Sequence, residues 1–248
     1  MPPTILIRTV GAYTDLLFPP RCVACGVELL DPHDNILVCG GCRPQLAPES
    51  KPRCPRCAAV SAADVDPAVG CLHCRGYEMR TDGVATLGDY SESLRMALLR
   101  MKRWWDEPVS LAIGELLARR LESQLRAWDV DVVLPAPMHW WRRLVRGTNS
   151  PDIVAAAAAR VARAPLAMSA LVRRRLTRPQ SSIPPGQRAE NIRGAFRIRR
   201  GCDFNRLRVL VVDDILTTGA TCNELAKVLK RAGAAAVFAV VVARAGRA

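Results

Sequence analysis

The sequence predicts an α/β protein, in which a mainly parallel sheet is flanked by helices and preceded by a small cysteine-rich unit. Three observations lead to this fold class. Apolar, β-branched runs alternate with amphipathic stretches over the C-terminal two thirds of the chain, which is typical of strands joined by helical crossovers. One of these runs ends in two acids and a segment rich in threonine and glycine. The first third of the chain carries four Cys-x-x-Cys pairs.

The N-terminal residues 4–18 read as a short amphipathic helix that ends at Pro19-Pro20. Arg8 and Asp15 interrupt its apolar residues, so it lacks the continuous apolar core of a signal peptide. The longest uncharged apolar stretch, residues 232–243, is too short to cross a bilayer and reads as a buried strand. We therefore expect no membrane insertion and a cytoplasmic location.

Eight of the ten cysteines form an internal repeat, because a shift of 32 positions maps the first four onto the second four. They are Cys22, Cys25, Cys39, Cys42, Cys54, Cys57, Cys71 and Cys74. The repeat predicts two tandem ribbons over about residues 21–76, each binding one structural zinc ion through four thiolates. A cross-braced arrangement, pairing the first Cys-x-x-Cys with the third, would use the same residues. The unbroken 32-residue register favours the sequential pairing.

Two other interpretations of the cysteines are weaker. Disulfides require an oxidising compartment, and without a secretion signal paired Cys-x-x-Cys motifs are far more often metal ligands. A thioredoxin-like redox site would need one pair on a βαβ unit. His33 and His73 lie close to the cysteines, but four thiolates already complete each tetrahedron. Cys222 could be a nucleophile at a helix start, yet no histidine lies nearby in sequence, and we expect it to be a packing residue.

The remaining elements follow in order. They are a strand at 83–90, a helix at 91–105, a helix from Pro108 to about 127, a strand at 131–134, an alanine-rich helix from Ser150-Pro151 to about 163, strands near 166–171, 195–198 and 208–212, a helix at 223–232 closed by Gly233, and a strand at 235–243. Residues 173–193 hold three prolines and predict a long loop, which in a compact domain is usually a lid or disordered. We divide the chain into domains 1–80 and 81–248.

The segment 209–221 carries the clearest chemical signal. Asp213 and Asp214 end a buried strand, and a loop leads directly into a helix, whose first N–H groups lack partners and attract an anion. The loop residues that we expect to hold one phosphate are Thr217, Thr218, Gly219, Ala220 and Thr221. Two acids suit a phosphate site only if the ligand also carries hydroxyls, as ribose 5-phosphate does. The alternative is an ordinary strand–helix turn whose aspartates cap the helix.

The net charge of +13 is unevenly distributed. Residues 1–80 are formally neutral, so the surplus lies in the second domain, and residues 160–208 hold thirteen arginines, no lysine and only two acids. Such a region can contact pyrophosphate, follow a nucleic-acid backbone, or simply be a solvated surface.

Over nearly its full length the chain resembles the ComF-type competence proteins, which are amidophosphoribosyltransferase-like. The segments that carry the resemblance are Leu17-Phe-Pro19, the double ribbon, Leu134 to His139, Arg146-Gly-Thr-Asn149, residues 173–196 and Val211 to Thr221. The last of these is similar to the phosphoribosyl-pyrophosphate (PRPP) motif of type I phosphoribosyltransferases. Thr148 and Ser150 depart from the family, which usually has an aromatic residue and a glutamine there.

The resemblance implies a type I phosphoribosyltransferase-like domain that binds PRPP with magnesium and transfers its ribose phosphate to an unknown base or amine. Asp213 and Asp214 would hold the ribose hydroxyls, Arg146 would belong to the PRPP site, and Arg188 or Arg178 in the 173–193 lid would meet pyrophosphate. The segment at Met138-His139 is the candidate pyrophosphate loop.

Two other classes of function remain open, because family members are linked to natural transformation and to the handling of single-stranded DNA. One is a non-catalytic, PRPP-sensing module that binds single-stranded DNA; the paired tryptophans at 104–105 and 140–141 could stack bases, although such pairs are more often packing residues. The other is an adaptor whose ribbons dock another transformation protein.

Overall fold

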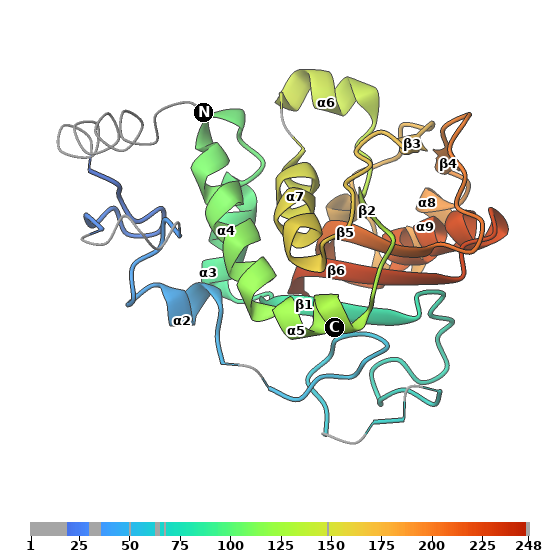
Figure 1. Ribbon diagram of the computed structural model, residues 1–248, viewed down its shortest axis with the longest axis horizontal. Coiled ribbons are helices and arrows are strands. Elements are labelled where there is room, and N and C mark those ends of the chain that lie inside the picture. The colour runs from blue at the N-terminus through green and yellow to red at the C-terminus, as the bar shows by residue number, and fades with distance from the viewer. Residues whose placement is uncertain are drawn as a thin grey trace, which may run out of the picture.

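The computed structural model describes residues 19–29, 36–49, 51–62, 65–66, 68–147 and 149–246. Its centre is a four-stranded parallel sheet with the strand order β1-β6-β5-β2 (Figure 1). The strands are β1 (Gly83–Asp89), β2 (Val132–Pro135), β5 (Arg208–Leu216) and β6 (Ala236–Arg244). The predicted α/β fold with a parallel sheet is confirmed, and every one of these strands was expected within a few residues of its bounds.

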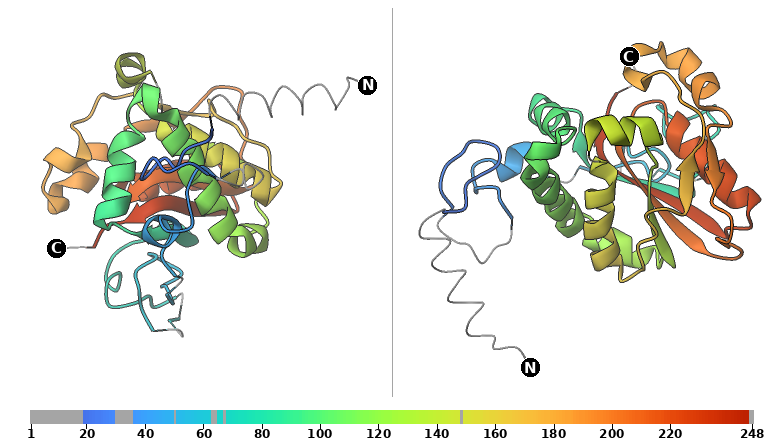
Figure 2. Two further views of the ribbon diagram at one scale, coloured as in Figure 1. Left: turned by 90° about the vertical axis from the view of Figure 1, so that its left-hand side faces the viewer. Right: turned by 90° about the horizontal axis from the view of Figure 1, so that it is seen from above.

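Helices cover both faces of the sheet, as Figure 2 shows from above. The helices are α2 (Arg43–Leu46), α3 (Glu92–Arg100), α4 (Glu107–Arg120), α5 (Glu122–Ala127), α6 (Trp140–Arg146), α7 (Ser150–Ala162), α8 (Arg188–Ile192) and α9 (Ala220–Arg231), with short 3-10 turns η2 (Trp104–Asp106), η3 (Gln180–Ser182) and η4 (Pro185–Gln187). Within the described residues, no helix has the length and apolar character needed to span a bilayer.

The central strand β5 shows why the sheet needs helices on both sides. Leu210 and Val212 pack into a core with α4 and α7, while Val209 and Val211 pack into a second core with α9. All four side chains are almost fully buried. Successive side chains of a strand point to opposite faces, so an unbroken apolar run requires cover on both of them.

A small antiparallel pair stands beside the main sheet. It consists of β3 (Leu171–Arg173) and β4 (Phe196–Ile198). Between these strands the chain forms η3, η4 and α8, so the segment expected to be a loop contains short helices. Prolines and a glycine allow only short turns over 179–187, whereas 188–192 contains no breaker and continues as a helix.

Each cysteine ribbon has the same backbone. Arg21 bridges Glu28 in the first ribbon, and Arg53 bridges Val60 in the second, again 32 positions later. At the matching position after the first Cys-x-x-Cys, Gly26 and Ala58 both have a left-handed φ, of 78° and 56°. The internal repeat predicted from the sequence is therefore a structural repeat.

Several expected boundaries were wrong. The helix expected at 91–105 ends at Arg100, where the side chain turns to bind the carboxylate of Asp106 in η2 at 2.7 and 3.0 Å. The helix from Pro108 is broken at Leu121, which leaves the helical φ and ψ range. Of the strand expected at 166–171, Leu166 forms an isolated bridge to Val133, and the strand β3 begins only at residue 171.

Two further differences concern residues beside the expected site. Helix α6, at 140–146, was not expected, because its start reads as two tryptophans after a proline-rich strand end. Strand β5 continues to Leu216 and α9 begins at Ala220, so Asp213 and Asp214 lie within the strand. The helix expected at 4–18 lies outside the described residues.

Candidate functional site: two four-cysteine centres and a cleft at the sheet edge

The eight repeated cysteines form two separate groups. Within each group the sulfur atoms lie within 4.8 Å of one another, and the members are Cys22, Cys25, Cys39 and Cys42 in one and Cys54, Cys57, Cys71 and Cys74 in the other. The sequential pairing favoured by the 32-residue register is confirmed, and the cross-braced alternative is wrong.

The sulfur geometry fits zinc. The distances are 3.7 Å for Cys25–Cys39, 3.6 Å for Cys57–Cys71 and 3.8 Å for Cys54–Cys74. A tetrahedron with Zn–S bonds of about 2.3 Å has edges of about 3.8 Å. Each group thus has the ligand type, number and spacing of a structural zinc site, consistent with two structural zinc ions.

The two centres differ in exposure. All four cysteines of the second group are buried, whereas Cys25 of the first is exposed. Among the described residues neither group includes a histidine, so His73 is not a ligand in this arrangement, and His33 lies outside those residues. The thiolates of the second centre are therefore the better shielded from solvent.

The candidate ligand site is a cleft of about 400 Å³ at the carboxyl edge of the parallel sheet. Its lining brings together the sequence-predicted residues Asp213, Asp214, Thr217, Thr218, Gly219, Ala220, Thr221 and Arg188. Ligands of open parallel sheets bind at this edge. We call residues 217–221 the phosphate loop.

Gly219 explains how the strand turns into the helix. It is the residue before α9 and has a φ of 79°, which an L side chain adopts only with strain. This turn leaves the first N–H groups of the twelve-residue helix α9 beside the cleft, where they favour an anion.

The two acids have different surroundings. The N–H of Asp214 donates to the Asp213 carboxylate at 2.9 Å, and Lys102 Nζ lies 3.8 Å from the Asp214 carboxylate. Desolvation, together with the neighbouring Asp214 charge, raises the pKa of Asp213 to about 8. A carboxyl held in this way gains strongly from hydroxyl donors or a cation.

Cationic and polar groups face the acids across the cleft. Arg173 and Arg188 both line it, and Gln180 lies between them in the segment 173–193. The Arg188 guanidinium donates to the Ile183 carbonyl at 3.1 Å, which fixes its position. Arg178, the other lid arginine considered from the sequence, is exposed and not among the cleft residues described.

The proline-rich strand end after β2 forms another wall. Met138 lines the cleft, whereas His139 is buried and its Nδ1 accepts the Trp141 N–H at 3.3 Å, which caps α6. His139 therefore has a structural explanation that needs no proton transfer. Arg146 is the last residue of α6, and its side chain is outside what the structure describes.

The element at 146–149 organises the start of α7. Asn149 is buried and donates to the Asp152 carboxylate at 2.6 Å and to the Ala136 carbonyl at 3.4 Å. Ser150, one of the two departures from the family, lines the cleft and donates to the Met101 carbonyl at 2.6 Å. The other departure, Thr148, lies outside the described residues.

Cys222 reaches the cleft floor but is buried, in a cluster with Leu216 and Val241. Desolvation and the charges of Asp213 and Asp214 raise the pKa of its thiol far above the ordinary range. A thiol that stays protonated is a poor nucleophile, which agrees with the expected packing role.

Sequence reasoning did not place three of the residues that line the cleft: Tyr90, Lys102 and Arg173. The first two follow β1 and α3, more than a hundred residues before the phosphate loop, and no local pattern links them to it. Arg173 was expected only as the first residue of the 173–193 lid and as part of the arginine excess.

A second surface feature is apolar. Four tryptophan side chains are 51–65% exposed: Trp104, Trp105, Trp140 and Trp141. The neighbouring Leu144 and Val145 are about 70% exposed. The two pairs belong to one area, because the turn that ends α6 at Gly147 lies against Trp104. We call these six residues the tryptophan patch. The paired tryptophans, expected from the sequence to be interior or half-buried packing residues, are not interior, although each pair packs edge to face.

Two parts of the chain match known domain families. Residues 13–77 match the double zinc ribbon domain, and residues 153–248 match the phosphoribosyl transferase domain. The first match covers both four-cysteine centres, and the second covers the phosphate loop and its two acids. The protein thus combines a double zinc ribbon with a phosphoribosyltransferase domain.

Curated relatives match the chain across both domains. Competence protein F of Haemophilus influenzae is 26% identical over 217 residues, covering 86% of this chain and 92% of the relative. DNA utilization protein YhgH of Escherichia coli K12 is 27% identical over 225 residues, covering 90% and 96%. The chain is therefore a homologue of competence protein F and YhgH, and the resemblance seen in its motifs is confirmed.

Solved structures match just over half of the chain. An allosteric regulatory enzyme of purine biosynthesis is 22% identical over 54% of this chain, with a TM-score of 0.36, and the match spans 26% of that longer chain. A purine phosphoribosyltransferase from Pyrococcus horikoshii is 18% identical over 57% of this chain and 75% of its own, with a TM-score of 0.34.

Proposed function

We propose that the cleft binds PRPP with magnesium and that the protein is a phosphoribosyltransferase-like member of the ComF type. One observation carries the proposal: two adjacent carboxylates and a helix-terminal phosphate loop open into the same 400 Å³ cleft. The 5-phosphate would bind the N–H groups of residues 217–221. The ribose hydroxyls would donate to Asp213 and Asp214, and pyrophosphate would face Lys102, Arg173 and Arg188.

The acids also suit the magnesium that accompanies PRPP. Carboxylate oxygens are the ligands that this ion prefers, and Asp213 and Asp214 provide them beside the proposed ribose position. Bound there with PRPP, magnesium would neutralise part of the pyrophosphate charge.

The proposed reaction breaks the bond between the anomeric carbon and pyrophosphate and forms a bond from that carbon to a base or amine nitrogen. The acceptor loses its proton to solvent, and pyrophosphate leaves with the bonding electron pair. The chain's residues would hold ribose and leaving group in place and exclude competing water, through Arg188 and the rest of the 173–193 lid. No covalent nucleophile is required.

The test is pyrophosphate release from PRPP and magnesium in the presence of a panel of bases and amines. We expect release that depends on one acceptor class and is absent in the Asp213→Asn, Asp214→Asn double variant, purified in parallel to exclude contaminating enzymes. Binding of PRPP without release for any acceptor would favour the non-catalytic sensing module. If the protein neither binds PRPP nor releases pyrophosphate from it, the proposal is contradicted.

The names of the relatives suggest the cellular process in which this activity would act. Competence protein F and DNA utilization protein YhgH point to DNA uptake and natural transformation, and we propose the same link for this protein. We expect it to act in the cytoplasm, where thiols stay reduced and available to zinc. We also propose that its ribbons dock another transformation protein.

A second candidate function is favoured by the tryptophan patch. Four exposed indoles in one area offer faces on which unpaired bases can stack, and the Arg103 guanidinium lies 5.9 Å from the Trp105 ring. We propose that this surface binds single-stranded DNA with little sequence preference. Exposed arginines outside the cleft, at 197, 199 and 200, would add contacts to the DNA backbone.

Fluorescence anisotropy with single-stranded oligonucleotides at low salt tests this candidate. Trp105→Ala with Trp141→Ala should weaken binding by at least roughly 30-fold, since each of the two lost stacking contacts contributes about 1–3 kcal/mol. Leu72→Ala, which removes an exposed apolar side chain of the second ribbon, is the control and should bind normally. Equal affinity of the tryptophan variant and the wild type would remove the patch from consideration.

A further inference from the structure

The second zinc ribbon is fastened to the helix that follows the phosphate loop. Asn223, in the first turn of α9, accepts the Arg80 N–H at 3.0 Å and donates to the Glu78 carbonyl at 2.8 Å. Those two backbone groups lie only a few residues after Cys74, the last ligand of the second centre. One side chain thus holds the end of the ribbon with two hydrogen bonds.

Met79, between those two residues, covers the loop itself. Its Cε lies 3.5 Å, and its Sδ 3.7 Å, from where a Cβ on Gly219 would stand. Met79 also packs on the buried cluster that contains Leu216 and Cys222, the residues just before and just after the phosphate loop. Ala58, which follows the ligand Cys57, belongs to the same cluster.

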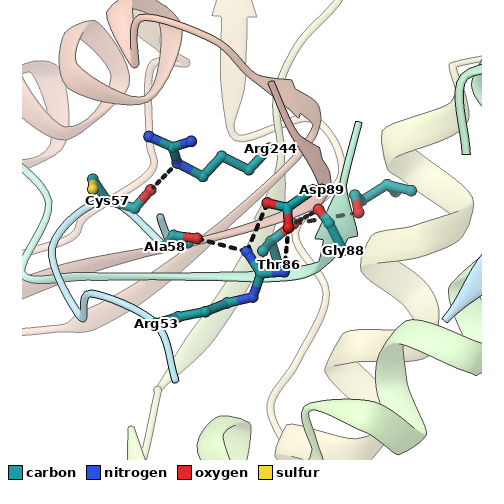
Figure 3. A network of polar contacts seen from close by, with 8 residues as sticks. Arg53, Cys57, Ala58, Thr86, Gly88, Asp89 and Arg244 are labelled. Atoms are coloured by element: carbon teal, nitrogen blue, oxygen red, sulfur yellow. Dashed lines mark hydrogen bonds and ion pairs between the residues drawn. The ribbon is translucent and has the colours of Figure 1, made fainter. Parts of the chain in front are cut away.

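Polar contacts tie the ribbon to the ends of β1 and β6, which lie in the same sheet as the strand β5 that leads into the loop (Figure 3). The buried Arg244 donates to the carbonyl of the ligand Cys57 at 3.0 Å, and Arg244 is paired in register with Leu216. Arg53 donates to the Ala58 carbonyl at 2.9 Å and to both carboxylate oxygens of Asp89 at 3.0 and 3.1 Å. The carboxyl edge of the sheet therefore rests on the folded second ribbon.

The first ribbon makes no comparable contact in the part of the chain that the structure describes. It meets α3, where the Arg100 guanidinium donates to the Val23 carbonyl, and its Ile36, Val38 and Leu46 pack into the core with α3 and α4. The chain thus contains an internal control: two centres with the same ligands, of which only the second touches the phosphate loop.

We infer that the second zinc centre positions the phosphate loop, through Asn223 and Met79, so that zinc at this centre and an anionic ligand in the loop strengthen each other's binding. The identity of that ligand rests on the proposed function; the coupling of ribbon to loop does not. Because linkage is reciprocal, ligand binding must protect the second zinc by the factor by which that zinc improves ligand affinity, typically about 5- to 150-fold.

Zinc release into a chromogenic chelator measures the coupling from the ligand side. Wild-type protein should lose two ions in two phases, assigned with Cys39→Ser and Cys71→Ser, which remove equivalent ligands of the first and second centres. Magnesium with PRPP should slow only the second-centre phase, by five-fold or more, and Asn223→Ala should abolish that protection. Equal protection of both centres would overturn the inference.

Hydrogen exchange of residues 217–223 without any ligand separates this inference from the proposed function. Exchange should quicken in Cys71→Ser and in Asn223→Ala but not in Cys39→Ser, nor in the control Lys227→Ala one turn along α9. Asn223→Asp keeps the acceptor for Arg80 but loses the donor to Glu78, and should be intermediate. If Cys71→Ser does not fold, loop exchange can instead be compared between wild type, wild type stripped of its second zinc, and Asn223→Ala.

If neither removal of the second zinc nor Asn223→Ala changes hydrogen exchange in the loop, the inference is overturned, whether or not the protein binds PRPP. Faster loop exchange in a protein that fails to bind PRPP would leave the inference standing and remove the proposed function.

Discussion

Replacing Asp213 and Asp214 together by asparagine should abolish magnesium-dependent PRPP binding in calorimetry. Each carboxylate would accept a ribose hydroxyl directly or through a magnesium-bound water, and hydrogen bonds to charged groups contribute about 1.5–3 kcal/mol each. Two of them correspond to a loss of roughly a hundred- to ten-thousand-fold in affinity. Ribose 5-phosphate should stabilise the wild type less than PRPP in a thermal melt, because the pyrophosphate contacts are missing.

The sign of the charge change makes this experiment decisive. At a pH above about 8, where both acids are ionised, the double variant loses two negative charges beside the proposed phosphate site, so a cleft that merely attracts anions would bind PRPP more tightly after the change. Glu92→Gln with Glu107→Gln makes the same charge change at exposed positions away from the cleft and should leave binding unaltered. Unchanged or tighter binding by the aspartate variant would remove the main argument for a PRPP site.

Local sequence patterns were enough for the centre of the site. The run from Val209 to Val212 could only be a strand buried on both faces, and the two acids followed by Thr-Gly at 217–221 could only lie at its carboxyl end. The zinc pairing was equally predictable, since a 32-residue shift relates all eight ligands and a repeat folds as a unit. Both signals depend on neighbours in sequence.

Contacts between distant segments were not predictable in this way. Lys102 reaches Asp214 across more than a hundred residues, and Met79 reaches Gly219 across a similar span. The exposure of the tryptophans also depends on tertiary structure: α6 stands away from the core, so its apolar side chains stay in solvent. An apolar residue in sequence indicates burial only when the fold provides a surface to cover it.

Metal analysis of purified protein should find two zinc ions per chain, and Cys39→Ser and Cys71→Ser should each retain one. Binding energy at a structural zinc site is folding energy, about 10–16 kcal/mol in isolated zinc-finger peptides, so loss of a thiolate should unfold the ribbon concerned. One ion or none in the wild type would contradict two tandem sites. Loss of both ions from either variant would show that the centres do not fold independently.

The two cysteine variants should differ in what happens to the rest of the protein. Unfolding the first ribbon removes its contact with α3 and the packing of Ile36, Val38 and Leu46 on the main core. Unfolding the second uncovers the buried cluster of Leu216 and Cys222 beside the phosphate loop and leaves the Arg244 guanidinium without the Cys57 carbonyl. Exposed apolar surface at the sheet edge and the lost hydrogen bond of Arg244 both lower the stability of the domain. Cys71→Ser should therefore lower the melting temperature of the phosphoribosyltransferase domain well below that of Cys39→Ser, measured by calorimetry at equal zinc content. Equal melting temperatures would mean that the second ribbon contributes no more to that domain than the first.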